Sequence, residues 1–495
     1  MNILASRSSR FAGILLFGLL AMTARNALDP DLWWHLRTGQ WIAETGQVPH
    51  SDPFSFTRLG RAWVSHEWLS ELLFYELWKR GGAVALIVFS AVITTAGFML
   101  LYLRCPGKPH WAAAATVLGA LVAAPSWGVR PQMFTFTLAS LLLWLIEAGE
   151  NRPKLLLSIP PLFLLWLNLH AGFALGPALL LAYGGGLILE LATGRTTWPA
   201  ARPVLTRVSL LLLVCLALVP LNPSGTQLYR YPFDTLRSPG MRSLIGEWFS
   251  PNFHEWLYRP LLLVWLLLLT ALASSRSRPR GRILVPLIFT SFAALDAVRH
   301  IPIFVLLAMP VLAAALPATS TALGVGPWRS STARTFFFAA VMALMAAFAV
   351  VKWTTLARNQ QAREKEQFPQ QAAAFLRNSD QSRRLFVYYD WGGYAIWKLY
   401  PHSRVFVDGR ADLYGDDLLR QFQTALQLRT GWEAILDQWR VDAVLLPPSS
   451  GLAQALLFDR NWSVAFHDPH SVVITRTPSM AAKAGFSDIS GSKGY

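Results

Sequence analysis

The chain has 495 residues, of which 53% are hydrophobic and only 15% are charged, so it carries more apolar surface than one soluble core can bury. Its net charge of +16 would suit a nucleic-acid partner, but the basic residues stand in short clusters between apolar runs, as in membrane proteins. We therefore expect a polytopic membrane protein that binds no nucleic acid. Both cysteines, Cys105 and Cys215, lie at or within apolar runs, so no disulfide framework or cysteine metal site is expected.

Apolar runs mark the membrane segments. The first, residues 11–24, follows Arg10 and is short, so cleavage as a signal peptide near Ala24 is an alternative. Because a helix that crosses ~30 Å of hydrocarbon needs about 20 residues, several runs must include flanking residues. We expect about eleven transmembrane helices within residues 1–353. After the first, the runs are 83–103, 111–127, 133–146, 155–167, 173–191, 208–221, 261–273, 283–295, 301–316 and 336–351.

Lysine and arginine indicate the orientation, since short cytoplasmic connectors carry an excess of both. With the N-terminus in the cytoplasm, alternate connectors are basic throughout, and an odd number of spans places the C-terminal domain outside. The connector 222–259 is also basic and falls outside, but long connectors weigh less under this rule. A multi-pass plasma (inner) membrane protein is predicted. The basic connector residues are Arg104 and Lys108; Arg152 and Lys154; Arg195, Arg202 and Arg207; Arg276, Arg278, Arg280 and Arg282; Arg329 and Arg334.

The first outer loop, residues 26–81, is large and unusual in content. Tryptophan favours the membrane–water interface, so we expect the loop to lie on the membrane, with Trp33 and Trp34 as interfacial residues. Acidic groups stand at Asp29, Asp31 and Glu67. Asp29 could instead cap a helix that begins at about Asp31. The loop tryptophans are Trp33, Trp34, Trp41, Trp63, Trp68 and Trp78.

After residue 353 the composition becomes that of a soluble protein. Residues 354–478 predict an extracytoplasmic α/β domain, with helices at 368–378, 418–428 and 432–439 and strands at 385–388, 404–407, 441–446 and 471–475. Residues 479–495 are rich in Ser, Gly, Ala and Lys and predict a disordered tail. The fold class is thus a polytopic α-helical membrane protein with a C-terminal soluble α/β domain.

Polar residues gather at the predicted outer ends of the spans. Asp296 stands three and four residues before Arg299 and His300, so one helical face would carry all three. Ionisable groups in membrane segments indicate function by default, and we expect one pocket beneath the outer leaflet with the first loop as its other wall. Alternatively the arginines snorkel, and the polar groups satisfy backbone at turns. The set is Asp31, Arg130, Asn168, His170, Asn222, Arg299 and His300.

Two short stretches resemble a known family. Asp31-Leu-Trp-Trp-His-Leu-Arg37 is similar to the Asp-Pro-Trp-Phe-Asn-Tyr-Arg stretch in the catalytic subunit of oligosaccharyltransferases, and Tyr388-Tyr389-Asp390-Trp391-Gly392-Gly393-Tyr394 resembles its Trp-Trp-Asp-Tyr-Gly motif. The resemblance points to the GT-C superfamily of polytopic, polyprenyl-phosphate-dependent glycosyltransferases. Here Tyr-Tyr replaces the opening Trp-Trp and Gly393 is additional, so a peptide acceptor is not implied. A strand end followed by a tight turn remains the alternative for residues 390–393.

The resemblance implies a membrane glycosyltransferase that moves a sugar from a polyprenyl-phosphate donor to an acceptor at the extracytoplasmic face. Asp31 would be the base or would orient the acceptor, and Asp29 or Glu67 would assist it or hold a divalent cation. No counterpart of the family's second metal motif is evident unless His66-Glu67 serves. Arg299, His300, Arg130 and His170 would bind the donor phosphate. Asp390 and Trp391 would contact the acceptor.

Two other functions remain open. A transporter or flippase of a lipid-linked or polar solute would need polar residues near the bilayer midplane and, often, broken helices in paired repeats. The polar residues here lie at one end and no repeat is visible, which favours the enzyme. A non-catalytic membrane protein with a GT-C-like fold would have the same pattern as the enzyme, and only activity separates the two.

Overall fold

The computed structural model describes residues 9–274, 279–315 and 331–477. The predicted tail, 479–495, and three of the basic residues named above, Arg276, Arg278 and Arg329, lie outside these ranges. The chain forms two compact units. We call Met1–Ala27, Leu77–Pro232 and Ile245–Arg358 the helical unit, and Leu28–Glu76, Phe233–Leu244 and Asn359–Tyr495 the loop–sheet unit.

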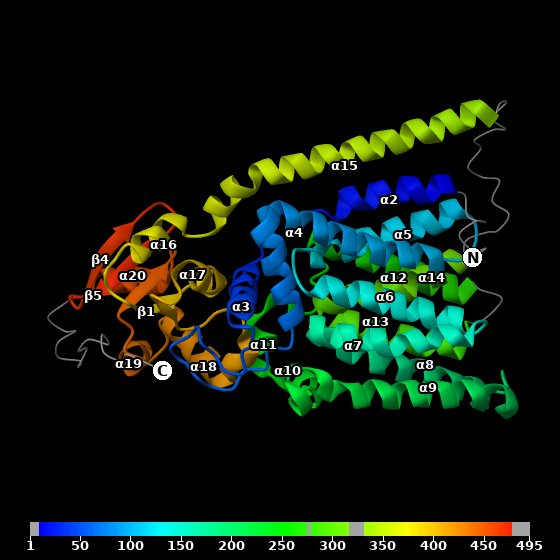
Figure 1. Ribbon diagram of the computed structural model, residues 1–495, viewed down its shortest axis with the longest axis horizontal. Coiled ribbons are helices and arrows are strands. Elements are labelled where there is room, and N and C mark those ends of the chain that lie inside the picture. The colour runs from blue at the N-terminus through cyan, green and yellow to red at the C-terminus, as the bar shows by residue number, and fades with distance from the viewer. Residues whose placement is uncertain (1–8, 275–278, 316–330, 478–495) are drawn as a thin grey trace. The chain divides into compact units, whose positions relative to one another are not determined.

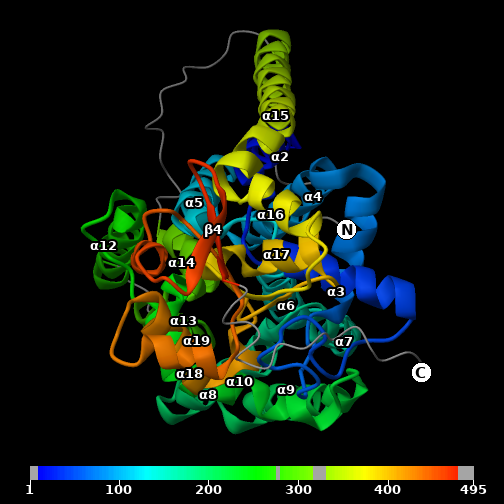
Figure 2. The same cartoon turned by 90° about the vertical axis from the view of Figure 1, so that its left-hand side faces the viewer.

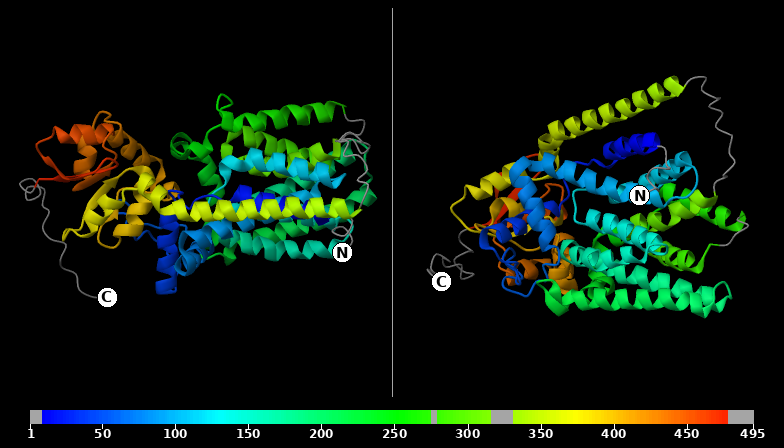
Figure 3. Two further views of the ribbon diagram at one scale, coloured as in Figure 1. Left: turned by 90° about the horizontal axis from the view of Figure 1, so that it is seen from above. Right: turned by 45° about the vertical axis from the view of Figure 1, so that its right-hand side comes forward.

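The helical unit is built from long apolar helices that pack side by side (Figures 1 and 3). The closest neighbours are α8 with α13, α5 with α14, and α13 with α14. Two of the helices, α4 and α15, continue into the loop–sheet unit. The helices are α2 (Ser9–Thr23), α4 (Trp68–Arg104), α5 (Pro109–Ala123), α6 (Gln132–Gly149), α7 (Ile159–Leu169), α8 (Leu175–Ala192), α9 (Trp198–Leu218), α12 (Arg259–Ser274), α13 (Gly281–Asp296), α14 (Ile301–Ala315) and α15 (Ser331–Gln367).

Within the described residues, seven helices are long and apolar enough to cross a membrane, and two shorter apolar helices, Phe11–Thr23 and Pro153–Leu169, accompany them. The predicted number of eleven spans stays a prediction. Large apolar side chains such as Leu213 of α9 and Leu266 of α12 are exposed, as lipid-facing residues would be. The seven long helices are Trp68–Arg104, Gln132–Gly149, Ala171–Ala192, Trp198–Leu221, Trp256–Ser274, Val298–Ala315 and Thr335–Gln367.

Helix α4 contains a break that separates the first loop from the apolar span. Gly81 has φ −148° and Gly82 has φ 57°, neither of which is helical. A positive φ favours glycine because it has no Cβ to clash with the backbone. The continuous apolar run therefore begins after the break, at Ala83, where the sequence predicted it.

The loop–sheet unit contains a five-stranded sheet in the order β2-β1-β3-β5-β4. Strand β1 pairs in parallel with β2 and β3, while β5 pairs antiparallel with β3 and β4. The predicted strands and helices are confirmed to within a few residues, except that the helix predicted from residue 418 begins at Ala411; β4, α17 and α20 were not predicted. The strands are β1 (Arg384–Val387), β2 (Arg404–Val405), β3 (Ala443–Leu446), β4 (Trp462–His467) and β5 (Val472–Arg476); the helices are α16 (Gln370–Arg377), α17 (Gly392–Leu399), α18 (Ala411–Leu426), α19 (Trp432–Gln438) and α20 (Gly451–Leu457).

The first loop folds together with this sheet. Its helix α3 (Leu32–Thr45) packs against α17 (Figure 2), and Ser55 forms a parallel bridge to Val405. The expectation that Trp33 and Trp34 are interfacial is wrong, because they are only 0% and 7% exposed. The Trp33 ring makes edge contacts with Phe368 and Tyr394, so its apolar surface is buried by protein.

A buried ionic cluster joins the loop to the sheet. The Arg410 guanidinium lies 2.8 Å from Asp52 Oδ1 of the loop and 2.7 Å from Asp408 Oδ2, which also accepts from the Tyr414 hydroxyl. Asp52 and Asp408 are fully enclosed and Arg410 nearly so. A buried charge is tolerated only when it is paired and hydrogen-bonded, so this cluster holds the two segments in a definite register.

Candidate functional site

Asp31 stands directly before α3, where the Asp29 carboxylate and the Trp34 indole hold it in position. Its backbone N–H donates to Asp29 Oδ1 over 3.0 Å, and the indole Nε1 of Trp34 donates to Asp31 Oδ1 over 3.1 Å. Asp29 therefore closes the turn that precedes the helix, but the N-cap of α3 is Asp31, so the alternative that Asp29 caps the helix is wrong. Asp31 is half-buried, and the indole holds one of its oxygens.

Two glycines of the C-terminal part approach this acid. A Cβ added at Gly409 would lie 1.8 Å from Asp31 Oδ1, and one added at Gly393 would lie 2.7 Å from the Pro30 carbonyl oxygen. Both distances are shorter than real Cβ contacts. A side chain at Gly393 would therefore clash with backbone, and one at Gly409 would displace the Asp31 carboxylate. The two stretches that carry the family resemblance thus meet inside one unit.

The 388–394 stretch does not form the tight turn considered above. A short 3-10 helix, η9 (Tyr389–Trp391), leads straight into α17. Trp391 is 4% exposed, and its indole Nε1 donates to the Gln367 carbonyl oxygen over 2.9 Å. Its side chain therefore packs in the protein interior. Asp390 reaches the surface, where crowding by the surrounding protein and then the Asp29 carboxylate raise its pKa. Asp390 is the polar group that this stretch presents to solvent.

Tyr389 was not among the predicted site residues. Its hydroxyl is buried and has no hydrogen-bond partner within the part of the chain that the structure describes. Burial raises the pKa of Tyr389, and the carboxylates of Asp31, Asp408 and Asp390 raise it further. A buried hydroxyl without a hydrogen-bond partner is unfavourable unless a bound molecule forms a hydrogen bond with it. The sequence signal was the second tyrosine of the motif, but nothing in the pattern showed that its hydroxyl would lie among carboxylates.

Glu67 belongs to a different group of side chains. Its Oε1 lies 2.8 Å from His66 Nε2 and its Oε2 3.7 Å from His35 Nε2, while His35 Nδ1 lies 3.5 Å from Glu71 Oε1. Burial lowers the pKa of His66, but the adjacent Glu67 outweighs it and raises the value to about 9. The sequence reading missed His35 and Glu71. Glu67 is therefore an ion-pair partner of two imidazoles.

The three candidate metal ligands are not gathered into one site. Among the described residues, no group of three or more His, Cys, Asp or Glu side chains is arranged to hold a metal ion. The oxygens of Glu67 face imidazoles, and one oxygen of Asp31 accepts from an indole. That Asp29, Asp31 or Glu67 holds a divalent cation stays a prediction.

In the helical unit, two of the predicted arginines flank a carboxylate that the sequence reading missed. Arg130 forms an ion pair with Glu247, whose other oxygen accepts from Gln132 Nε2 over 3.0 Å. Burial alone would raise the pKa of Glu247, but the guanidinium groups of Arg130 and Arg299 hold it below its ordinary value. Arg299 also lies 4.3 Å above the Trp248 ring, a cation–π arrangement.

His300 joins the same cluster, but not through the expected helical face. Its ring meets the Trp248 ring edge-on at 6.1 Å, and its Nδ1 lies 3.2 Å from the Ala293 carbonyl oxygen. Helix α13 ends at Asp296, and Ala297 is extended (φ −148°, ψ 136°) before the 3-10 turn η8 (Val298–His300). The prediction that Asp296, Arg299 and His300 share one face is wrong because the helix stops between them.

His170 lies at the same end of the helical unit. Its Nδ1 lies 2.7 Å from Thr135 Oγ1 and accepts from the Gly172 N–H over 3.0 Å, which fits the alternative that it satisfies a turn. Thr135 stands one turn after Gln132 in α6, so the His170 and Arg130 contacts adjoin one another along that helix. The four predicted cationic residues therefore share one end of the helical unit, while the predicted acids belong to the loop–sheet unit.

Comparison with known proteins supports this architecture. No protein-family profile and no curated sequence matches the chain. Among solved structures, the archaeal oligosaccharyltransferase AglB of Archaeoglobus fulgidus, in complex with an inhibitory peptide and a dolichol-phosphate, superposes with a TM-score of 0.55 at 12% identity, over 89% of this chain and 69% of its own. ArnT of Cupriavidus metallidurans, bound to undecaprenyl phosphate, gives a TM-score of 0.50 at 15% identity, over 95% and 97%.

At such low identity these likenesses establish the fold. The chain is a polytopic α-helical membrane protein with a GT-C-like fold, similar to the folds of these two proteins.

Proposed function

We propose that this protein is a membrane glycosyltransferase that moves a sugar from a polyprenyl-phosphate-linked donor to an acceptor at the extracytoplasmic face. The observation that carries the proposal is the close approach of Gly393, in the 388–394 stretch, to Trp34 of the 31–37 stretch, whose indole donates to Asp31. The fold is also that of AglB and ArnT, whose structures hold dolichol-phosphate and undecaprenyl phosphate.

On the acceptor side, Asp31 is the proposed base. An acceptor O–H attacks the anomeric carbon, the bond from that carbon to the phosphate oxygen breaks, and Asp31 takes the proton as the polyprenyl phosphate leaves. The Trp34 indole donates to Asp31 Oδ1 and so orients the carboxylate that receives the proton. The unpartnered Tyr389 hydroxyl and the exposed Asp390 are the proposed acceptor contacts, with Asp29 holding the turn that positions Asp31.

On the donor side, Arg130 and Arg299 are the proposed phosphate ligands, with His170 and His300 beside them. A guanidinium binds two phosphate oxygens at once and stays charged, so it stabilises the negative charge that develops on the leaving group. Glu247 lies between the arginines and keeps them in place while leaving a net positive cluster.

The proposed orientation follows the distribution of Lys and Arg. It places the N-terminus in the cytoplasm of an inner membrane and the loop–sheet unit outside. The external position of the loop–sheet unit can be tested with a single cysteine introduced at exposed Asp417, in a protein that lacks Cys105 and Cys215. Labelling by a membrane-impermeant maleimide in intact cells supports the orientation, and labelling only after lysis contradicts it.

The activity is tested with membranes supplied with a radiolabelled polyprenyl-phosphate sugar. Asp31→Asn keeps an oxygen for the Trp34 indole but cannot accept the proton, so transfer should fall about a hundredfold or more. Asp417→Asn is the matched control, because Asp417 is 85% exposed and pairs only with Arg420 among the described residues. Full transfer by Asp31→Asn would remove Asp31 from the mechanism.

A further inference from the structure

The helical unit contains a cavity of about 570 Å³ near one end of its helices, well within the range of ligand pockets. It lies among α6, α8, α12, α13 and α14, with the end of α4 at its margin. Its deeper wall is apolar, and the side chains that define it include Leu143, Leu179, Ile283, Leu307, Pro310 and Val311. Leu143 and Leu307 stand six and eight residues before the ends of their helices, so the cavity reaches ~10 Å into the unit.

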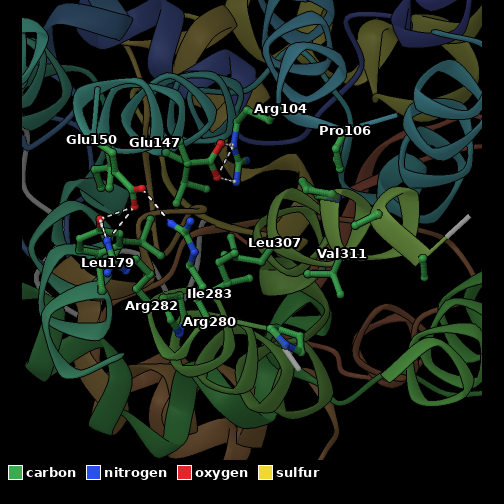
Figure 4. A pocket seen from close by; sticks show the side chains of 18 of the residues that line it. Arg104, Pro106, Glu147, Glu150, Leu179, Arg280, Arg282, Ile283, Leu307 and Val311 are labelled. Atoms are coloured by element: carbon green, nitrogen blue, oxygen red, sulfur yellow. Dashed lines mark hydrogen bonds and ion pairs between the residues drawn. The ribbon is translucent and has the colours of Figure 1, made fainter. Parts of the chain in front are cut away.

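The margin of the cavity is charged with both signs (Figure 4). Arg104 pairs with Glu147 over 2.7 Å, and Arg280 and Arg282 each lie 3.0 Å from Glu150. The exposed fractions of the Arg280 and Glu147 side chains are 63% and 46%, so both retain surface that a ligand can contact. The cavity therefore has a mixed-charge mouth above an apolar interior.

This mouth is built rigidly. Pro310 has no amide hydrogen, so the Leu306 carbonyl oxygen four residues earlier lacks its usual helical partner. Arg104 Nη1 donates to that oxygen over 2.8 Å, and its remaining donors bind both oxygens of Glu147. The Arg104 side chain is 2% exposed. A guanidinium held in this way keeps Glu147 fixed at the cavity margin.

The cavity lies at the opposite end of the helical unit from the proposed phosphate-binding cluster. Arg130 precedes the start of α6, whereas Glu147 and Glu150 lie at its other end. Arg282 stands at the start of α13, whereas Arg299 and His300 follow its end. Helices of 16 and 18 residues separate their ends by roughly 25 Å, so one ligand headgroup cannot occupy both places.

We propose that this cavity binds a zwitterionic glycerophospholipid, with part of an acyl chain in the apolar interior. Its ammonium group donates hydrogen bonds to the Glu147 and Glu150 carboxylates, and Arg280 binds its phosphate. A purely anionic headgroup would face two carboxylates, and a purely cationic one would face three guanidinium groups. An ammonium and a phosphate on one headgroup match both signs. The site is separate from the transfer chemistry proposed above and does not depend on it.

The test uses the full chain, purified in mild detergent, stripped of lipid and exposed to vesicles of phosphatidylethanolamine mixed equally with phosphatidylglycerol. Bound lipid is counted by native mass spectrometry. Arg280→Ala removes the exposed phosphate ligand and should lower occupancy tenfold or more, as expected for hydrogen bonds to charged groups. Val311→Trp fills the cavity and should abolish binding. The matched controls are Arg152→Ala at the same end of α6 and Ile288→Trp on an exposed face of α13.

The expected result is one phosphatidylethanolamine retained by the wild type and both controls and lost from the two cavity variants, with unchanged melting temperatures. Equal occupancy in all five proteins would overturn the site. Preference for phosphatidylglycerol would overturn the zwitterionic assignment. Displacement of the lipid by an equal concentration of soluble phosphoethanolamine would show that the headgroup alone is recognised, and would overturn the role of the acyl chain.

Discussion

The Asp31 carboxylate lies so close to Gly409 that a Cβ atom added to this glycine would lie only 1.8 Å from Asp31 Oδ1. Asp31 belongs to the first loop and Gly409 to the sheet domain, far apart in the sequence. The contact sets the position of the proposed base.

Gly409→Ala should displace Asp31 without removing its carboxylate. We expect transfer to fall nearly as far as in Asp31→Asn, because a shift of ~1 Å at the reacting group costs about a hundredfold. The extra methyl should destabilise the fold by only about 1–3 kcal/mol. Transfer and thermal unfolding are measured together, with Gly451→Ala as the control, since its added Cβ meets Leu428 at an ordinary 3.4 Å. Wild-type activity in Gly409→Ala would contradict the close approach.

Tyr389→Phe separates function from structure. The hydroxyl has no partner among the described residues, so its removal should leave stability equal or raise it by up to about 1 kcal/mol. If the hydroxyl binds the acceptor, the KM for the acceptor should rise about tenfold or more while the KM for the donor stays constant. A variant with unchanged kinetics would assign Tyr389 to packing alone.

Arg299→Ala should weaken donor binding selectively. Loss of a charge-assisted phosphate contact corresponds to about 1.5–3 kcal/mol, or roughly 10- to 100-fold in the KM for the polyprenyl-phosphate sugar. Arg259→Ala is the matched control, because Arg259 also stacks on a tryptophan, 3.8 Å from the Trp256 ring, outside the cluster. Equal effects of both substitutions on the donor KM would show that Arg299 contributes only its stacking on Trp248.

The buried cluster around Arg410 should dominate the stability of the loop–sheet unit. Arg410→Ala leaves Asp52 and Asp408 buried without their cation and should cost about 3–5 kcal/mol. Arg420→Ala removes an exposed ion pair with Asp417 and should cost less than about 1 kcal/mol. Denaturant unfolding monitored by tryptophan fluorescence gives both values. Similar losses in the two variants would contradict the distinction between buried and exposed pairs.

The His66–Glu67 pair makes stability depend on pH. The pKa of His66 is about 9 in the folded chain against an ordinary 6.5, so folding favours the protonated form. The stabilisation is therefore fully present below about pH 6.5 and is lost as pH rises through about 9, by at most about 3 kcal/mol. Melting temperatures across this window should fall more steeply for the wild type than for His66→Gln. Parallel curves would contradict the pairing.

The membrane helices and most of the sheet were predictable because their signals are local. Apolar runs and alternating strands depend on neighbouring residues, and the break at Gly82 falls where the apolar run begins. The contacts that organise the candidate sites are not local. Asp52 and Arg410 are 358 positions apart, and nothing near either residue indicates the other.

The same limit explains the errors. Trp33 and Trp34 have the composition of interfacial residues, and only their contacts with distant aromatic side chains show that protein buries them. Glu247 lies in an irregular connector, where no helical or strand periodicity indicates which residues face the interior. Asp296 was placed beside Arg299 by counting helical turns, a method that fails where Ala297 leaves the helix.

The buried ionic cluster that contains Asp52 and Arg410 also has a consequence for the synthesis of the protein. The ribosome completes the first loop long before it reaches residue 359. The aromatic and acidic side chains of the loop therefore lack their C-terminal contacts while the intervening helices enter the bilayer. A nascent chain that stops early would display that unfinished surface to proteases. We therefore expect the first loop to reach its buried arrangement only after residue 410 has been synthesised.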